Sequence, residues 1–375
     1  MTEKPREIES DIVHLARVAL TGRSQDVSAL VQRVARKYRT AMPDMSSALS
    51  SLLIEAPTRA SPLRRNAEVP MPVDTDSRLH LLRVEANPLL DHEPVFVPRV
   101  AQGLSMIVQE RRNIAALNKL GLDPSKTCLF IGPPGVGKTM AAYWLARELS
   151  KPLMILDLAA VMSSYLGRTG TNLRHVLDYA KSTDCVLLVD ELDAIAKRRD
   201  DNAEIGELKR LVTVLIQQLD DWPSDGLLIA ATNHPDLLDP AIWRRFETKV
   251  EFPVPDQQTA TQLINLLLAG HLASVGTWAP VLAAYFLGQS FSDIERELKS
   301  IRRASALSGV SVDEKLLGLV RSDAMPKADK IRVATLLVAA KIISQRQAHE
   351  MFGVSRDTIR KKSKSDILDI GESDD

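Results

Sequence analysis

Hydrophobic positions follow two alternating patterns through the middle of the chain. Short apolar runs are separated by longer segments whose apolar residues recur every three or four positions. The runs predict buried strands and the segments predict amphipathic helices, so their order indicates a parallel sheet with helices on both faces. The predicted strands are Cys128–Ile131, Leu153–Leu156, Val186–Val189, Leu227–Ala231 and Lys249–Phe252.

Helical spacing also precedes this alternation. Residues 7–20 and 27–38 each carry an apolar stripe, and a third short helix is expected at residues 46–54. These helices predict a small N-terminal domain in which no pattern points to a reaction. Prolines then become frequent up to Pro98, which favours a linker, and one helix is expected over residues 99–120.

Composition narrows the class of protein. The 375 residues are 26% charged and 45% hydrophobic, with 48 basic against 48 acidic residues and no net charge. No global field therefore favours nucleic acid or an anionic membrane, and any such binding must be local. No apolar run approaches the roughly 20 residues that span a bilayer. With two cysteines, Cys128 and Cys185, both in apolar runs, we expect a cytoplasmic protein without disulfides.

A glycine-rich loop lies between the first predicted strand and a helix. Its glycines let backbone N–H groups point at a phosphate, and the start of the following helix favours the same anion. We expect Lys138 to reach the β- and γ-phosphates of a nucleotide and the hydroxyl of Thr139 to bind Mg²⁺. The predicted nucleotide-binding residues are Gly132, Pro133, Pro134, Gly135, Val136, Gly137, Lys138, Thr139, Met140 and, from a later strand, Asp190.

Polar residues follow two further strands. Asp190 and Glu191 end the run at Val186–Val189, on the ligand side of an open parallel sheet. Asp190 is expected to hold Mg²⁺, together with Thr139, and Glu191 to activate the attacking water. Asn233 follows the next strand, where its amide can position that water.

Two adjacent arginines follow a short apolar segment. Arg244 and Arg245 carry guanidinium groups that can stabilise charge on a transferring phosphoryl group, supplied by a neighbouring subunit. As isolated residues they would read as a solvated surface patch.

Four segments, taken together, resemble the AAA family of AAA+ ATPases. Gly132–Thr139, Leu187–Asp193, Ala231–Asn233 and Asp239–Phe246 are similar to its Walker A, Walker B, sensor 1 and arginine-finger segments. The resemblance covers about residues 97–305. It implies an α/β P-loop core with a five-stranded parallel sheet, a small helical lid, ATP and Mg²⁺ as cofactors, and a ring, typically a hexamer, with ATP between subunits.

Two further segments extend the resemblance. Residues 162–167 resemble the first pore loop of the family, which implies that Tyr165 and Leu166 grip a polypeptide substrate. Arg168 follows where the family usually has an acidic residue. Residues 286–303 resemble the lid region called sensor 2, although Phe291 stands where the family often has glycine.

The segment at residues 344–364 resembles a bacterial helix-turn-helix. Gly353 fits the turn, Ser355 an N-cap and Ile359 the buried face of the second helix. His349 departs from the small residue usual at its position. The basic residues of this segment can meet DNA, while many such units pack only against protein. They are Arg356, Arg360, Lys361, Lys362 and Lys364.

The layout of the whole chain, including Gly206–Leu215, is similar to bacterial AAA ATPases paired with a subtilisin-like serine protease, here necessarily a separate chain. The first hypothesis is an ATP-hydrolysing ring that remodels protein substrates. The second is a DNA-linked switch ATPase of a defence or mobile-element system, and the third a nucleotide-binding scaffold without turnover.

The sequence predicts six parts. They are an N-terminal domain (1–56), a linker (57–96), an ATPase core (97–254), a lid (255–325), a helix-turn-helix-like segment (326–365) and an acidic tail (366–375).

Overall fold

The computed structural model of the protein divides into two units, residues 1–70 and 71–375. In the first unit Leu30, Val31, Val34 and Lys37 are helical, within the helix predicted at 27–38. The helices predicted at 7–20 and 46–54, the pore residues Tyr165 and Leu166, Lys362, Lys364 and the acidic tail lie outside the described residues. The structure describes residues 30, 31, 34, 37, 38, 42, 45, 82–90, 92–158, 169–194, 204–321 and 325–361.

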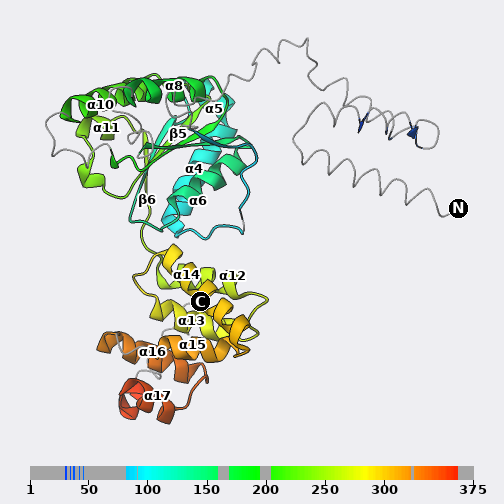
Figure 1. Ribbon diagram of the computed structural model, residues 1–375, viewed down its shortest axis with the longest axis vertical. Coiled ribbons are helices and arrows are strands. Elements are labelled where there is room, and N and C mark those ends of the chain that lie inside the picture. The colour runs from blue at the N-terminus through cyan, green and yellow to red at the C-terminus, as the bar shows by residue number, and fades with distance from the viewer. Residues whose placement is uncertain are drawn as a thin grey trace. The chain divides into compact units, whose positions relative to one another are not determined.

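The second unit contains a six-stranded sheet with the strand order β1-β3-β4-β5-β2-β6. The sheet lies in the upper part of the view in Figure 1, above helices α12 to α17. Strands β2 to β6 are parallel and coincide with the five predicted runs, so the predicted α/β fold is confirmed. The bounds of the strands are β1 Arg83–Glu85, β2 Thr127–Ile131, β3 Leu153–Asp157, β4 Val186–Asp190, β5 Leu227–Thr232 and β6 Thr248–Glu251.

The sixth strand corrects the prediction for residues 57–96. Strand β1 lies in the predicted linker and pairs antiparallel with β3, with Arg83 opposite Ile155 and Glu85 opposite Leu153. A strand of three residues is too short to show an alternating pattern, so the prolines around it dominated the prediction. Its position closes one edge of the parallel sheet.

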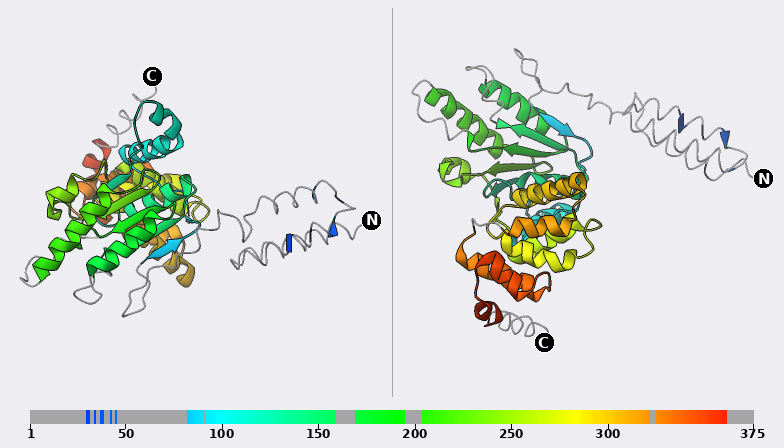
Figure 2. Two further views of the ribbon diagram at one scale, coloured as in Figure 1. Left: turned by 90° about the horizontal axis from the view of Figure 1, so that it is seen from above. Right: turned by 60° about the horizontal axis from the view of Figure 1, so that its bottom comes forward.

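Helices cover both faces of the sheet (Figure 2). Leu187 and Val189 of β4 pack with α8 and α10, whereas Val186 and Leu188 pack with α4 and α6. Strands buried on both faces have continuous apolar sequences, which is why these runs were recognisable. The helices of the α/β part are α4 Pro98–Arg112, α5 Ile114–Lys119, α6 Lys138–Glu148, α8 Thr169–Lys181, α10 Glu204–Asp220 and α11 Pro240–Trp243, with a 3₁₀ turn η2 at Pro235–Leu237.

The single helix expected at residues 99–120 is two helices. Asn113 separates α4 from α5, and its side-chain amide donates to the carbonyl of Gln109 at 2.8 Å. This bond satisfies a carbonyl at the end of α4 and gives the chain a local alternative to continuing the helix.

The helices that follow the sheet share a second hydrophobic core. Trp278, Leu282 and Leu298 of the predicted lid share this core with Leu337 and Ile359 from the predicted helix-turn-helix-like segment. The two segments are therefore packed together as a single body. Its helices are α12 Gln257–Leu268, α13 Val275–Tyr285, α14 Phe291–Ser308, α15 Val312–Val320, α16 Lys327–Ala339 and α17 Gln345–Phe352.

The C-terminal helices have helix-turn-helix geometry. Helix α17 begins with a capping box between Ser344 and Gln347 and ends at Gly353, whose φ of 65° is left-handed. Residues 356–361 are helical again. Ser355 caps this second helix by accepting a hydrogen bond from the amide of Thr358 at 3.2 Å, and Ile359 is fully buried.

The sequence predicts that the chain has no membrane-spanning helix and no disulfide, and the described residues bear on both predictions. No helix among them has both the length and the apolar character needed to cross a bilayer. Cys128 and Cys185 are free and buried, and burial raises the pKa of the Cys185 thiol to about 12. Such a thiol behaves as a small apolar side chain.

Candidate functional site

The glycine-rich loop is enclosed by the ends of two neighbouring strands. The amide of Gly132 donates to the carbonyl of Thr232, the last residue of β5, at 3.3 Å. A Cβ atom at Gly132 would lie 2.1 Å from the backbone oxygen of Phe252, directly after β6. Only glycine fits this position, so the start of the loop is fixed against the sheet.

The loop then turns through two left-handed residues. Gly135 and Gly137 have φ values of 78° and 91°. Gly137 precedes the first turn of α6, which has no side-chain cap among the described residues. The unpaired N–H groups and the positive end of the helix therefore face the concave side of the loop, which suits an anionic group.

Lys138 is buried beneath this loop with its ammonium group fully hydrogen bonded. It donates to the carbonyls of Gly132 at 2.6 Å and Pro133 at 2.9 Å, and to Oδ1 of Asn233 at 2.8 Å. Burial lowers the pKa of Lys138, while the nearby carboxylates of Asp190 and Asp193 oppose this shift. A phosphate oxygen at this position would replace neutral acceptors with a charged one, which strengthens the hydrogen bond.

Two oxygen ligands suitable for Mg²⁺ meet beside Lys138. The hydroxyl of Thr139 donates to Oδ2 of Asp190 at 3.2 Å, and Oδ1 of Asp190 accepts from the amide of Glu191 at 2.9 Å. Mg²⁺ prefers hydroxyl and carboxylate oxygens of this kind and keeps several waters. The structure thus brings the two predicted metal ligands together from α6 and β4, and this donor set fits the ion.

Glu191 lies at the mouth of the site. It follows β4 with a φ of 53°, a left-handed value that is uncommon for a residue other than glycine, and its side chain is exposed. Strained backbone of this kind is typical of functional positions. The carboxylate is free to reach a water molecule beside the loop.

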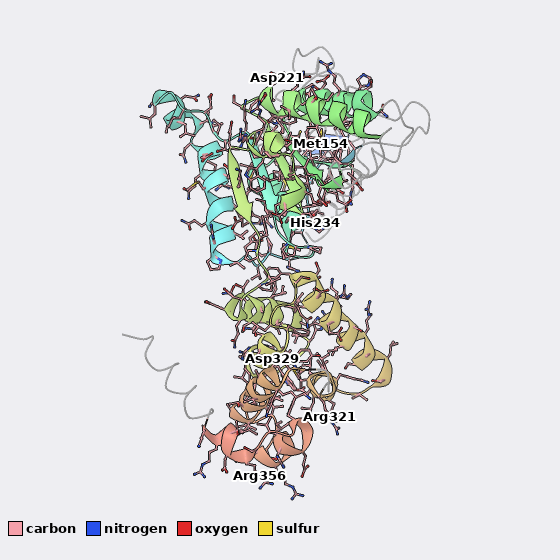
Figure 3. The ribbon with its side chains drawn as sticks, turned by 90° about the vertical axis from the view of Figure 1, so that its left-hand side faces the viewer. Met154, Asp221, His234, Arg321, Asp329 and Arg356 are labelled. Atoms are coloured by element: carbon pink, nitrogen blue, oxygen red, sulfur yellow. The ribbon has the colours of Figure 1, made fainter. Side chains whose placement is uncertain are left out.

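Asp193 is a positioning residue that the sequence reasoning missed. Its Oδ1 accepts from the hydroxyl of Thr232 at 3.1 Å and from the amide of Asn233 at 3.2 Å, and the residue is 1% exposed. It therefore fixes the backbone that carries Asn233, next to the labelled His234 at the end of β5 (Figure 3). The signal available in the sequence was a third carboxylate within four residues after a buried strand.

In the residues that the structure describes, the two adjacent arginines are not bonded to the glycine-rich loop of their own chain. Arg244 and Arg245 follow α11 and, among the described residues, neither bonds to the loop at 132–139. Arg245 forms an ion pair with Asp220 at 2.7 Å. Arg244 is exposed, and its guanidinium has no hydrogen bond or ion pair within the described part of the chain, although its backbone amide donates to the carbonyl of Pro240 at 3.2 Å. The structure therefore distinguishes two residues that the sequence treated alike.

The lid touches the glycine-rich loop directly. The amide of Ser292 in α14 donates to the carbonyl of Gly135 at 3.1 Å, and a Cβ atom at Gly135 would lie 2.5 Å from Oγ of Ser290. Ser290 caps α14 by accepting from the amide of Asp293, and its hydroxyl donates to that carboxylate, which lowers the pKa of Asp293. The sequence reasoning did not assign Ser290, although a serine three residues before an aspartate is a capping pattern.

Phe291 connects the two hydrophobic cores. Its ring packs against the lid core with residues such as Ile294 and also against the α4/α6 side of the sheet with Val136 and Phe252. The bulky residue at a position where the resemblance leads to glycine therefore serves as a packing bridge.

A pocket of about 410 Å³ opens beside the start of α6. Its lining includes Thr139 and Met140 of α6, Arg83 and Glu85 of β1, and Glu295 of the lid. The segment before α4 is bound to α6, because Oε1 of Glu93 accepts hydrogen bonds from Arg147 at 2.7 Å and from Trp144 at 3.2 Å. The pocket thus shares Thr139 with the glycine-rich loop.

Comparison with known proteins agrees with this geometry. A family model described as the ATPase family associated with various cellular activities (AAA) matches residues 128–254. Over these residues the chain is similar to AAA ATPase domains. The match contains the glycine-rich loop, Asp190, Glu191, Asn233 and the arginine pair.

The relatives match only part of their own length. An uncharacterized AAA family ATPase, y4kL, of Sinorhizobium fredii is 40% identical over 198 residues, which cover 53% of this chain and 58% of that protein. The probable 26S proteasome regulatory subunit 10B of Caenorhabditis elegans is 32% identical over 44% of each chain. The proteasome-activating nucleotidase of Methanothermobacter thermautotrophicus is 28% identical over 60% of this chain and 57% of its own.

The contact between Gly135 and the lid generates a test. Gly135→Ala forces the lid away because its Cβ would overlap Oγ of Ser290, whereas Gly121→Ala has a similar φ of 70° and no atom within 4 Å. Both substitutions add left-handed strain of about 1 kcal/mol. We expect only Gly135→Ala to speed hydrogen exchange at the Ser292 amide, measured by mass spectrometry. Equal exchange at Ser292 in the two variants would contradict the contact.

Proposed function

We propose that the protein binds MgATP and hydrolyses it to ADP and phosphate at the site around residues 132–139. The observation that carries this proposal is the convergence of Lys138, Thr139, Asp190 and Asn233 within hydrogen-bonding distance from three separate elements. Lys138 and the loop amides bind the β- and γ-phosphates, while Thr139 and Asp190 hold Mg²⁺. Glu191 activates water, and Asn233 positions it.

We propose that the nucleoside part of ATP lies in the pocket beside Thr139 and Met140. The phosphates must sit at the start of α6, and this pocket shares that wall. Its volume of about 410 Å³ is within the range of small-molecule sites. Closure by Glu295 would let the lid report whether nucleotide is bound.

A ring of subunits, typically six, would complete the site. Arg244 is exposed, and its guanidinium has no partner among the described residues and no bond to the loop of its own chain. A guanidinium in this state is available to a phosphate bound by a neighbouring subunit. Arg245 is the alternative finger, but its ion pair with Asp220 restrains it.

The first choice of substrate is protein. Two of the relatives are named as proteasome regulatory or proteasome-activating proteins, which supports coupling of ATP hydrolysis to polypeptide movement. Tyr165 and Leu166 would grip the polypeptide, as their resemblance to a pore loop implies. A separate subtilisin-like peptidase partner and the cytoplasmic location stay predictions from the sequence.

A DNA-linked switch ATPase is the second candidate. The observation that favours it is the helix-turn-helix geometry of residues 344–361, with basic side chains on the second helix. In that case DNA, in place of protein, would be the input that changes ATP hydrolysis.

Removal of the proposed general base should separate binding from hydrolysis. We expect Glu191→Gln to retain ATP while hydrolysis falls about 100-fold or more, because only proton transfer from water is lost. Lys138→Ala should abolish binding itself. Filter binding and phosphate release measure the two steps. Unchanged hydrolysis by Glu191→Gln would show that another group is the base.

The free arginine should act between subunits. We expect Arg244→Ala to keep nucleotide binding but to lower kcat by about 1,000-fold, as loss of an arginine finger does. Arg245→Ala, which removes an exposed ion pair, should have the smaller effect. Rings that mix Arg244→Ala and Glu191→Gln subunits should regain hydrolysis. If such rings form and stay inactive, Arg244 does not act in a neighbour's site.

The choice between protein and DNA as input is testable in the full-length protein. We expect an unfolded protein to stimulate steady-state ATP hydrolysis, and Tyr165→Ala to lose this response while basal hydrolysis remains. Arg360→Ala, which changes the C-terminal helix, serves as the parallel variant. Stimulation by duplex DNA that only Arg360→Ala loses would favour the switch ATPase over the remodeller.

A further inference from the structure

The second helix of the C-terminal helix-turn-helix exposes Arg356, Arg360 and Lys361 against a single carboxylate, Asp357, and none of the three basic residues forms an ion pair among the described residues. We propose that the face formed by these basic residues binds the phosphate backbone of duplex DNA, and that the lid links its affinity to the nucleotide held at residues 132–139. The second half of the proposal rests on the proposed function, whereas the first half does not. Arg356 lies at the outer end of the helical region, beyond Asp329 and Arg321 (Figure 3).

The described residues of the helix-turn-helix pack against the lid core of the same chain. Ala348, Phe352 and Val354 are buried in the lid core, and Ile359 anchors the second helix there. His349, which looks unsuitable in the sequence, donates from Nδ1 to the carbonyl of Val354 at 2.9 Å and ties α17 to the turn. The second helix is therefore held firmly while its outer face stays exposed.

The charges on this face are unbalanced. Arg356 and Arg360 are four residues apart and so share one side of the helix, and both are exposed without an ion pair among the described residues. Lys361 is also exposed. Like charges at this spacing destabilise a helix by a few tenths of a kcal/mol. Phosphate groups would remove that repulsion and supply bonds to both guanidinium groups.

Other exposed helices of the chain balance charge at the same spacing. Arg346 pairs with Glu350 at 2.9 Å, Arg174 lies 4.0 Å from Asp178, and Lys299 pairs with Glu295. The comparison with Arg346 is the most direct, because it lies on α17 of the same helix-turn-helix. The arginines of the second helix thus lack the compensation that their neighbour has. In a helix-turn-helix the second helix is the one that enters the major groove.

A continuous set of contacts joins this face to the ATP site. The Gly135 carbonyl accepts from Ser292 in α14, and Phe291 packs on both hydrophobic cores. Leu298 of α14 shares its core with Leu337 of α16 and Ile359 of the second helix. Any shift of the loop that moves α14 must therefore move the basic face. Coupling between two sites is reciprocal, so DNA would change nucleotide affinity by the same factor.

The first experiment measures the surface alone. Full-length protein is titrated, without nucleotide, onto a fluorescein-labelled duplex of about two helical turns while anisotropy is recorded between about 50 and about 200 mM salt. We expect Arg356→Ala and Arg360→Ala each to lower the slope of log affinity against log salt by about 1. Arg346→Ala, with the same loss of charge on α17, should leave the slope unchanged. Absent DNA binding, or equal slopes in all variants, overturns the proposal.

The second experiment measures the link. The same titration is repeated with ADP and with a non-hydrolysable ATP analogue, and we expect affinities that differ between the two by about fivefold or more. Phe291→Ala should retain DNA binding but bind DNA equally well with either nucleotide. If Phe291→Ala does not fold, the same measurement is made with Phe291→Leu. Equal affinities with both nucleotides in the unsubstituted protein overturn the link. Failure of nucleotide to bind, with DNA binding intact, would instead count against the proposed ATPase function.

Discussion

The close approach of backbone to backbone around the glycine-rich loop is the constraint on which the rest of the site depends. At Gly132 the loop passes the carbonyl of Phe252 at a distance that leaves no room for a Cβ atom, and at Gly135 it meets the side chain of Ser290 and accepts a hydrogen bond from the backbone amide of Ser292 in the lid. The sheet therefore fixes one side of the loop and the lid the other. With both fixed, the first turn of α6 and the side chain of Lys138 can point only into the space between them.

Buried charge explains why this space selects an anion. Lys138 is 7% exposed, and its burial is offset by three oxygen acceptors and by the carboxylates of Asp190 and Asp193. A buried ammonium group is costly unless it is well hydrogen bonded, and the two backbone carbonyls are neutral acceptors. A phosphate oxygen supplies the negative charge that they lack. The carboxylates alone would repel that phosphate, and a divalent cation held by Thr139 and Asp190 would offset this repulsion.

Most of the fold was readable in the sequence because its strands are buried on both faces. Runs such as Val186–Val189 are apolar at every position, and the five parallel strands appear where these runs predict them. Strand β1 was missed because three residues show no periodicity, and the break at Asn113 was missed because a side-chain bond to the backbone leaves no mark on the apolar stripe. A sequence pattern therefore predicts an element when the element's own residues carry the full periodicity.

The site residues divide in the same way. The loop, Lys138, Asp190 and Glu191 follow strands directly, so their chemistry could be inferred from position along the chain. Asp193, Ser290 and the separate states of Arg244 and Arg245 depend on partners at least 25 positions away, namely Thr232, Gly135 and Asp220. His349 is the opposite case, because it departed from a family pattern yet fits once its bond to Val354 is seen. A single sequence does not show which side chains far apart along the chain form contacts.

The shared core of the lid and the C-terminal helices decides how this half of the protein can move. The sequence separates them at residue 325, but Val333, Leu337 and Ile359 are fully buried against the lid. Exposing each such side chain costs about 1.5–3 kcal/mol, so parting the two segments would cost several times a typical allosteric coupling of about 1–3 kcal/mol. A nucleotide therefore cannot separate them, and any force on α14 must displace the whole helical body as one. Phe291, packed on both cores, is the residue through which that displacement has to pass.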